Sequence, residues 1–210
     1  MWKEVVAPIY KTVVGLQDTK DYMKVDENDE NVLIESFIAT AGRLAENFTR
    51  RRFLTQTHDL FLDSLVNRSG GSSAWWNGTR EGTEDFAFGL ARNYIEITRV
   101  PLQSVTFIKT FDTANVESTF AAESYFVDEV STPARIVLND GFSWPTGLRR
   151  YNAFQIRCIV GYGNAAAIPD DIQDAIKAQV HYMFLNRHVG NSQLSGIAED
   201  LLLPNQVQAL

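Results

Sequence analysis

The feature that most constrains the fold is a change in the spacing of apolar residues along the chain. Between residues 57 and 160, apolar and polar side chains alternate in short runs, a period of two that is typical of β-strands. In the flanking segments apolar residues recur every three or four positions, which is typical of amphipathic helices. Strands enclosed by helical segments predict an α+β fold with an inserted antiparallel β-domain, because a parallel sheet would alternate strands with helices.

Turn residues divide this central segment into short strands. The predicted strands cover residues 57–63, 94–98, 105–111, 124–130, 135–138 and 154–160. Pro101, Pro133 and Asp140-Gly141 lie between strands and favour turns. Short antiparallel strands with turns between them predict a small sandwich or barrel.

Two long helices are predicted, one on each side of the strands, and they are expected to pack as an antiparallel pair. The first begins after Asp26, Asn28 or Asp29, whose side chains can cap a helix, and ends near Thr49. Its apolar stripe is Leu33, Phe37, Ala41, Leu44 and Phe48. The second begins at Pro169, and its stripe is Ile172, Ala175, Ile176, Val180, Met183 and Phe184. A short helix over residues 19–24, capped by Asp18, completes the helical body.

These patterns divide the chain into four parts. Residues 1–15 are predicted to be an extended N-terminal arm, 16–56 and 164–189 the helical body, 57–163 the inserted β-domain, and 190–210 a flexible C-terminal tail. The tail carries Leu201, Leu202 and Leu203 with no apparent core of its own. We therefore expect these leucines to dock on another protein, and we expect deletion of residues 191–210 to leave the fold intact.

Charge and cysteine content exclude several classes of function. The chain has 210 residues and a net charge of −7, which argues against tight binding of nucleic acid without excluding a place beside DNA. Its one cysteine, Cys158, lies in a predicted strand, so it is interpreted as a buried thiol, and neither a disulfide nor a cysteine-based metal site is expected. No signal-peptide pattern and no run of about 18 apolar residues are present, so neither secretion nor a membrane span is predicted.

Gly161-Tyr162-Gly163-Asn164-Ala165-Ala166 matches the G-x-G-x-x-A pattern of dinucleotide-binding turns. The context does not match, because the next helix begins only at Pro169 and no strand with an acidic residue follows about 20 positions on. Gly161, Gly163 and Pro169 are instead interpreted as a structural hinge between the β-domain and the helical body. No nucleophile, metal or phosphate-binding motif is present, so we expect no catalytic residue, metal or cofactor.

Two polar segments allow more than one interpretation. Arg50, Arg51 and Arg52 fit the solvated last turn of a helix, where cations suit the helix dipole, or a patch that binds phosphate or a partner. Trp75 and Trp76 lie in a Gly- and Ser-rich loop. They either pack onto the β-domain or contact a neighbouring protein, a carbohydrate or a peptide.

Taken in order, several short motifs resemble those of head–tail connector (adaptor) proteins of long-tailed phages and gene transfer agents. The motifs are Leu16-x-x-x-Lys20-x-x-Met23-Lys24-Val25-Asp26, Thr55-Gln56-Thr57, Val100-Pro101-Leu102-x-Ser104-Val105, Tyr125-x-Val127-Asp128, Trp144-Pro145, Val160-Gly161-Tyr162-Gly163 and Ile168-Pro169-x-x-Ile172-x-x-Ala175-Ile176. The resemblance spans residues 16–188. The chain departs from it at Arg50-Arg51-Arg52, where these proteins more often have Thr-Gly-Arg, and in the long loop that contains Trp75 and Trp76.

The resemblance implies a structural virion protein, not an enzyme. Such proteins assemble in the host cytoplasm into a ring, usually of twelve copies, beneath the portal in the virion neck. The ring extends the DNA channel through which the genome is ejected, and it presents a platform for a stopper or tail protein. On this resemblance the portal is expected to be the docking partner of Leu201, Leu202 and Leu203. A neighbouring subunit or the stopper is expected to contact Trp75, Trp76, Arg50, Arg51 and Arg52. The alternative is a nucleotide- or carbohydrate-binding α+β domain that uses the Gly161 turn or the two tryptophans.

Overall fold

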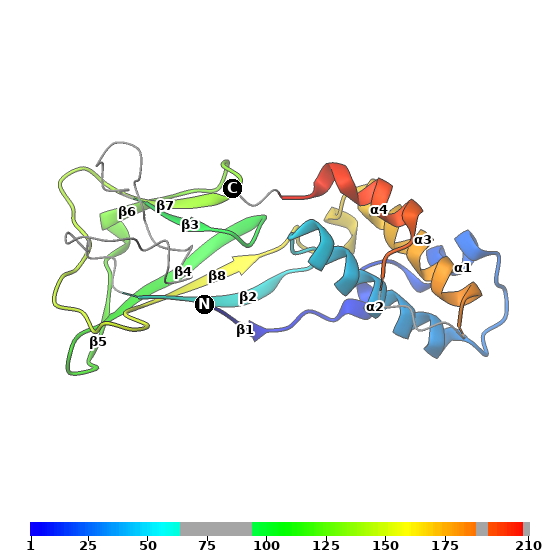
Figure 1. The fold of residues 1–210 in the computed structure, drawn as a ribbon, viewed down its shortest axis with the longest axis horizontal. Helices are drawn as coiled ribbons and strands as arrows, with labels where there is room; N and C mark the ends of the chain where they lie inside the picture. The colour runs from blue at the N-terminus through cyan, green and yellow to red at the C-terminus, as the bar shows by residue number, and fades with distance from the viewer. Residues whose placement is uncertain (64–93, 188–192, 208–210) are drawn as a thin grey trace. The chain divides into compact units, whose positions relative to one another are not determined.

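The structure is a computed structural model that describes residues 1–63, 94–187 and 193–207. The chain divides into two compact units (Figure 1). The β unit contains Met1–Val6, Thr57–Thr98 and Leu102–Ile159, and the helical unit contains Ala7–Gln56, Arg99–Pro101 and Val160–Leu210. Trp75 and Trp76 lie outside the described residues.

The described part of the helical unit contains α1 (Leu16–Met23), α2 (Asn31–Thr49), α3 (Asp170–Leu185) and α4 (Gly196–Leu202). It also contains the short 3₁₀ turns η1 (Tyr10–Thr12), η4 (Ala165–Ala167) and η5 (Leu203–Asn205). The helices α2 and α3 pack together and run in opposite directions (Figure 1). Their core contains Ile34, Ile38, Ile172, Ile176, Val180 and Leu202. At about 1.5–3 kcal/mol for each large apolar side chain, this burial accounts for much of the unit's stability.

The buried face of α2 differs from the predicted stripe. Ile34, Ile38 and Ala45 are fully buried, whereas Leu33, Phe37 and Phe48 are only half-buried. The prediction followed the largest side chains. The helix instead turns small residues such as Gly42 toward its neighbours, and the Val13 side chain lies 3.0 Å from the position of a Cβ on Gly42. The predicted stripe of α3 is confirmed, with Phe184 at its partly buried edge.

Two predicted helix starts are shifted. Helix α1 begins at Leu16, so Asp18 lies inside its first turn and the N-cap residue is Gly15. Pro169 is the N-cap residue of α3 and not its first helical residue, and its carbonyl accepts the amides of Ile172 and Gln173, both at 3.1 Å.

The described part of the β unit contains two separate sheets. The five-stranded sheet has the order β1 (Trp2–Val6), β2 (Gln56–Leu62), β8 (Phe154–Val160), β4 (Leu102–Phe111) and β5 (Glu117–Thr119). The three-stranded sheet has the order β3 (Tyr94–Ile97), β7 (Ala134–Leu138) and β6 (Tyr125–Asp128). The α+β class and antiparallel pairing are confirmed, and within the described residues neither sheet closes into a barrel.

Alternation along the strands determines which side chains form the β core. Every second residue of β8 is buried, including Phe154, Ile156 and Cys158. Ile108 of β4 and Ile136 of β7 are also fully buried. Along β4 and β8 the residues on the other face are half-buried, so one face of this sheet forms core and the other remains partly open, although Asp59 of β2 on that second face is buried.

The two chain ends differ from the predicted arm and tail. Residues 2–6 form β1, which pairs with β2, and Val13 and Val14 lie in the helical core. In the C-terminal segment, Ser195 caps α4 by accepting the amide of Ala198 at 3.3 Å. Ala198 and Leu202 are fully buried, and Leu202 belongs to the core of the helical unit, so residues 196–202 are packed onto that unit. Within the described residues, no helix combines the length and apolar character that a membrane span requires.

Candidate interaction surfaces

The C-terminal segment is bound to the end of α2 by backbone and side-chain hydrogen bonds. The amide of Val207 donates to the carbonyl of Thr49 at 2.9 Å, and Gln206 Nε2 donates to the carbonyl of Phe48 at 3.1 Å. Arg51 Nε donates to the carbonyl of Asn205 at 2.7 Å. The last carbonyls of a helix have no partner within it, so this segment completes the C-terminus of α2.

The three predicted docking leucines have different environments. Leu202 is 0% exposed and belongs to the helical core, so it is not available to a partner in this conformation. Leu201 is 36% and Leu203 60% exposed. Ile197, four positions before Leu201 on α4, is 68% exposed, so α4 has one apolar edge toward the core and one toward solvent. Sequence reasoning missed this helix, although Ser195 followed by paired apolar residues is a local helix signal.

The arginine triplet is largely occupied within the chain. Arg50 ends α2 in the left-handed conformation and is exposed. Arg51 binds Asn205, and Arg52 Nη1 donates to Glu46 Oε2 at 3.1 Å. The amide of Arg52 also donates to the carbonyl of Val100 at 2.8 Å. Arg50 is the most exposed of the three, and whether any of them contacts a partner stays a prediction.

Glu46 is a buried carboxylate that joins several segments of the helical unit, and no sequence motif indicated it. It accepts hydrogen bonds from Tyr10 Oη at 2.7 Å, from the amide of Phe53 at 2.7 Å, from Gln56 Nε2 at 2.8 Å and from Arg52. Burial raises the pKa of Glu46 above its ordinary value, and the hydrogen bonds from Phe53, Tyr10 and Arg52 only partly oppose the rise. Both carboxylate oxygens of Glu46 already accept hydrogen bonds from within the chain, so its role is structural.

The turn at Gly161 is a tight backbone crossing with no space for a phosphate group. Gly161 has φ +117°, and a Cβ built on it would lie 2.3 Å from the carbonyl oxygen of Leu54. The amide of Gly161 donates to Pro101 at 2.8 Å, and the amide of Tyr162 donates to Phe53 at 2.9 Å. A dinucleotide turn needs amides directed at the pyrophosphate, and here they are directed at the chain itself. Gly163 also has a positive φ, +131°. Whether these residues act as a hinge stays a prediction.

The partly open face of the five-stranded sheet carries a chain of ionic contacts. Asp59 of β2 accepts from Arg157 Nε at 2.7 Å, Arg157 Nη2 at 2.9 Å and Gln155 Nε2 at 2.7 Å. Burial acts to raise the pKa of Asp59, but the hydrogen bonds from Arg157 and Gln155 outweigh it and hold the pKa below its ordinary value. Lys3 is the register partner of Asp59 and contributes to this effect.

The same contacts continue to the opposite edge of the sheet. The guanidinium of Arg157 lies 4.8 Å and the ammonium of Lys109 5.2 Å from the ring centre of Phe107 on β4. Lys109 then pairs with Glu117 of β5 at 3.1 Å and is the register partner of Thr119. We call the set Lys3, Asp59, Phe107, Lys109, Glu117, Thr119, Gln155 and Arg157 the charged face.

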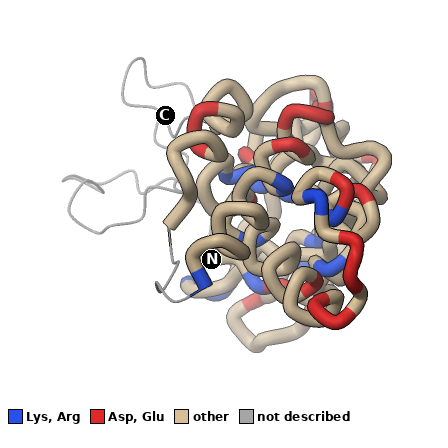
Figure 2. The backbone as a smooth tube through the Cα atoms, turned by 90° about the vertical axis from the view of Figure 1, so that its right-hand side faces the viewer, with Lys and Arg blue, Asp and Glu red and all other residues tan. Residues whose placement is uncertain are grey.

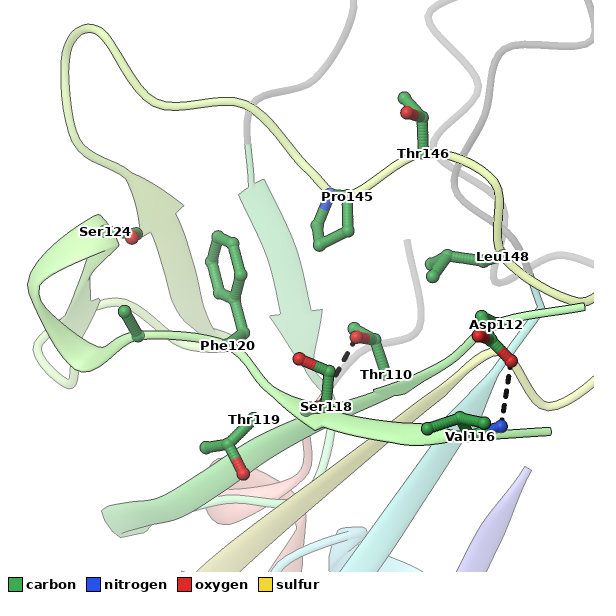
Figure 3. A pocket seen from close by; sticks show the side chains of 11 residues that line it. Thr110, Asp112, Val116, Ser118, Thr119, Phe120, Ser124, Pro145, Thr146 and Leu148 are labelled. Carbon is green, nitrogen blue, oxygen red and sulfur yellow. Dashed lines mark hydrogen bonds between the residues drawn. The ribbon is translucent and has the colours of Figure 1, made fainter. Parts of the chain in front are cut away.

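A surface hollow of about 420 Å³ lies elsewhere on the β unit (Figure 3). Thr110 and Ser118 line it from β4 and β5, Phe120 lines it from just after β5, and Pro145 and Leu148 form its opposite wall. Asp112 also lines it, but its Oδ1 accepts the amides of Ala114 and Val116, both at 2.8 Å, and so holds a turn. Hydroxyl and apolar groups dominate the hollow, and this composition provides no general base.

His58, His181 and Cys158 lie in environments that fit a structural role. His58 is fully buried, with its ring 6.3 Å from that of Trp2, and the ring of His181 lies 6.1 Å from that of Tyr22. Burial raises the pKa of Cys158 to about 12, which makes it a poor nucleophile. The part of the chain that the structure describes contains no cluster of side chains suited to a metal ion.

Comparison with known proteins connects this fold with one kind of assembly. No protein family matches the sequence. No curated protein matches it either. The fold is similar to that of chains in three solved structures, each aligned over 100% of this chain and 97% of the other. The first is the neck of an empty gene transfer agent (GTA) particle computed with C6 symmetry, with 17% sequence identity and a TM-score of 0.74. The second is the virion of a native GTA particle, with 17% identity and a TM-score of 0.71. The third is the neck of a native GTA particle computed with C12 symmetry, with 18% identity and a TM-score of 0.69. At these identities the match shows that this chain shares its whole fold, both units included, with chains of those particles.

Proposed function

We propose that this protein is a structural component of the neck of a phage-like particle, where it forms a ring beneath the portal that connects the head to the tail. The observation that supports this most strongly is the fold similarity over the whole chain to chains from gene transfer agent particles, in two cases from their necks. The order of motifs that resembles connector proteins is independent of that comparison. On this proposal the protein acts through its surfaces and is not an enzyme.

The net charge of −7 fits a ring that surrounds passing DNA. Basic walls would hold the phosphate backbone, whereas an acidic chain lets DNA move without sequence-specific binding. Figure 2, in which the right-hand side of Figure 1 faces the viewer, shows more red acidic positions than blue basic ones on the elements nearest the viewer. The proposed partners are further copies of this chain, the portal protein, and a stopper or tail protein.

The exposed edge of α4 is the proposed portal contact. Ile197, Leu201 and Leu203 offer apolar side chains to a partner, while Leu202 holds the helix on the core. Replacing both Leu201 and Leu203 by Asp should abolish binding to purified portal protein and leave the melting temperature nearly unchanged. Val32→Asp is the matched control, since Val32 is 76% exposed on α2 and should tolerate the change. Unchanged portal binding by the double variant would refute this contact.

The proposed function is tested by removing the gene from cells that produce the particles. We expect heads that package DNA but carry no tails, and restoration of tailed particles when the wild-type chain is supplied. Normal tailed, infectious particles in the absence of the chain would overturn the proposal. The nucleotide-binding alternative has no support from the geometry, because the Gly161 turn is closed by the Leu54 carbonyl.

A further inference from the structure

The charged face has the composition of a protein contact. It joins all five strands, and it presents an aromatic ring, Phe107, between two cations. The side chains of Lys109 and Arg157 are 29% and 32% exposed, so their cationic groups remain within reach of a partner. Arginine and aromatic side chains are enriched at protein interfaces, where they combine apolar area with directed hydrogen bonds.

The net charge of the charged face is opposite in sign to that of the whole chain. Lys3, Lys109 and Arg157 outnumber Asp59 and Glu117 by one, although the whole chain has a net charge of −7. Its complement should therefore be a surface with several carboxylates. The helical unit supplies such a surface between α1 and α2, where residues 26–30 read Asp-Glu-Asn-Asp-Glu.

This acidic segment is held in one conformation by a buried amine. Lys20 is 3% exposed, and its Nζ donates to Asn28 Oδ1 at 2.8 Å and to Asn31 Oδ1 at 3.1 Å. Glu30 is paired with Arg187, whereas Asp26, Glu27 and Asp29 are exposed. Because the backbone is already ordered, binding through these carboxylates would lose little conformational entropy.

We propose that the charged face of one copy binds the acidic segment, residues 26–30, of a second copy. The two surfaces are different, so the contact is heterologous, and repetition of it around an axis closes a ring. The inference rests on the proposed neck ring and specifies which surfaces of neighbouring copies meet. DNA is a weaker candidate for the same face, because Asp59 and Glu117 would repel phosphates and an excess of one positive charge neutralises few of them.

Crosslinking in assembled particles tests the contact. Thr119 on the charged face and Glu27 in the acidic segment are both exposed, so each can be replaced by Cys. Cys158 is fully buried and does not compete for the reagent. Particles that carry Thr119→Cys together with Glu27→Cys are treated with a short bismaleimide and analysed on a denaturing gel. The matched control pairs Thr119→Cys with Thr40→Cys, an exposed position on α2.

We expect a ladder of oligomers beyond the dimer for the Thr119/Glu27 pair and monomer for the control. A particle that contains the chain in its neck but gives no ladder, or stops at the dimer, would overturn this contact and leave the proposed function standing. Absence of the chain from necks would overturn both. As a second measurement in the same Thr119→Cys/Glu27→Cys background, Lys109→Glu and Asp29→Lys should each lower the ladder yield about fivefold or more, and their combination should restore it. Loss of DNA retention without loss of the ladder would instead assign Lys109 to DNA.

Discussion

Each unit contains a buried carboxylate, and the surroundings shift the pKa of the two carboxylates in opposite directions. In the helical unit Glu46 receives hydrogen bonds from four residues, yet burial still raises its pKa. In the β unit Asp59 accepts hydrogen bonds from Arg157 Nε and Nη2 and from Gln155 Nε2, and its pKa is lowered. The difference shows that Glu46 is a fixed internal junction, whereas Asp59 belongs to a surface network that remains charged and can take part in a contact.

The largest expected effect is at the turn that closes the helical unit. Gly161→Ala would place a Cβ 2.3 Å from the Leu54 carbonyl at φ +117°. We expect a loss of about 4 kcal/mol or more, or failure to fold, measured by denaturant unfolding with circular dichroism. The control is Gly147→Ala in the β unit, where φ is +73° but no atom lies within 4 Å. Its cost should be about 1 kcal/mol. Equal losses would show that backbone strain, and not the close approach, determines the effect.

Removing each carboxylate compares the two networks directly. Glu46→Ala leaves Tyr10, Gln56 and the Phe53 amide without their acceptor in a buried site, and we expect a loss of about 3–5 kcal/mol. Asp59→Ala should cost about 1–3 kcal/mol, because the Arg157 side chain is 32% exposed and can turn to water. Hydrogen exchange measured for each unit separates the two losses. A larger loss for Asp59→Ala would contradict the comparison.

Adjacent leucines test whether the C-terminal segment is part of the helical unit. Leu202→Ala removes a fully buried side chain and should cost about 2–5 kcal/mol. Leu203→Ala, at a residue 60% exposed, should change stability by about 0.5 kcal/mol or less and weaken portal binding instead. For the same reason, deletion of residues 191–210 should destabilise the helical unit, contrary to the expectation from sequence. Calorimetry of the three variants checks the order of the effects.

The pH dependence of stability should have opposite signs at the two carboxylates. The pKa of Glu46 is raised in the folded state, so its stabilising contribution is complete below the ordinary value of 4.5 and is lost as the pH rises through the folded pKa. The pKa of Asp59 is lowered, so its contribution is complete above 3.8 and is lost as the pH falls through the folded pKa.

The two contributions can be separated by unfolding free energies measured across acid pH. Relative to wild type, Glu46→Gln should remove a loss of stability above pH 4.5, and Asp59→Asn should remove a loss below pH 3.8. Each slope is limited to about 1.4 kcal/mol per pH unit. The same sign of change for both variants would refute the assignment.

Local patterns were sufficient to predict much of the fold. The strand at Phe154–Val160 and the start of the helix after Pro169 match the structure within a residue, because alternation and the proline start are set by neighbouring residues. The buried face of α2 was predicted only in part, since Ala41 is fully buried but Phe37 and Phe48 only pack against the edge of the core. Leu33 and Ile34 are equally apolar, and the choice between them depends on what packs against the helix.

The contacts that define the surfaces depend on residues far apart in sequence. Arg51 binds Asn205 and Arg157 binds Asp59, and no spacing rule connects the members of either pair. Leu202 was predicted to contact a partner because its segment follows a polar stretch, yet it completes a core formed by α2 and α3. Composition gave the acidic character of the chain, but only the strand register placed Lys3 beside Asp59 on one face.

Cryo-electron microscopy of particle necks tests the central proposal most directly. Particles would be purified from cells in which the chain carries a small tag and reconstructed with rotational symmetry. The account predicts a ring beneath the portal whose density fits both units of this fold, with the tag at every copy. A neck whose density is fully explained by other chains, with no copy of this one, would contradict it.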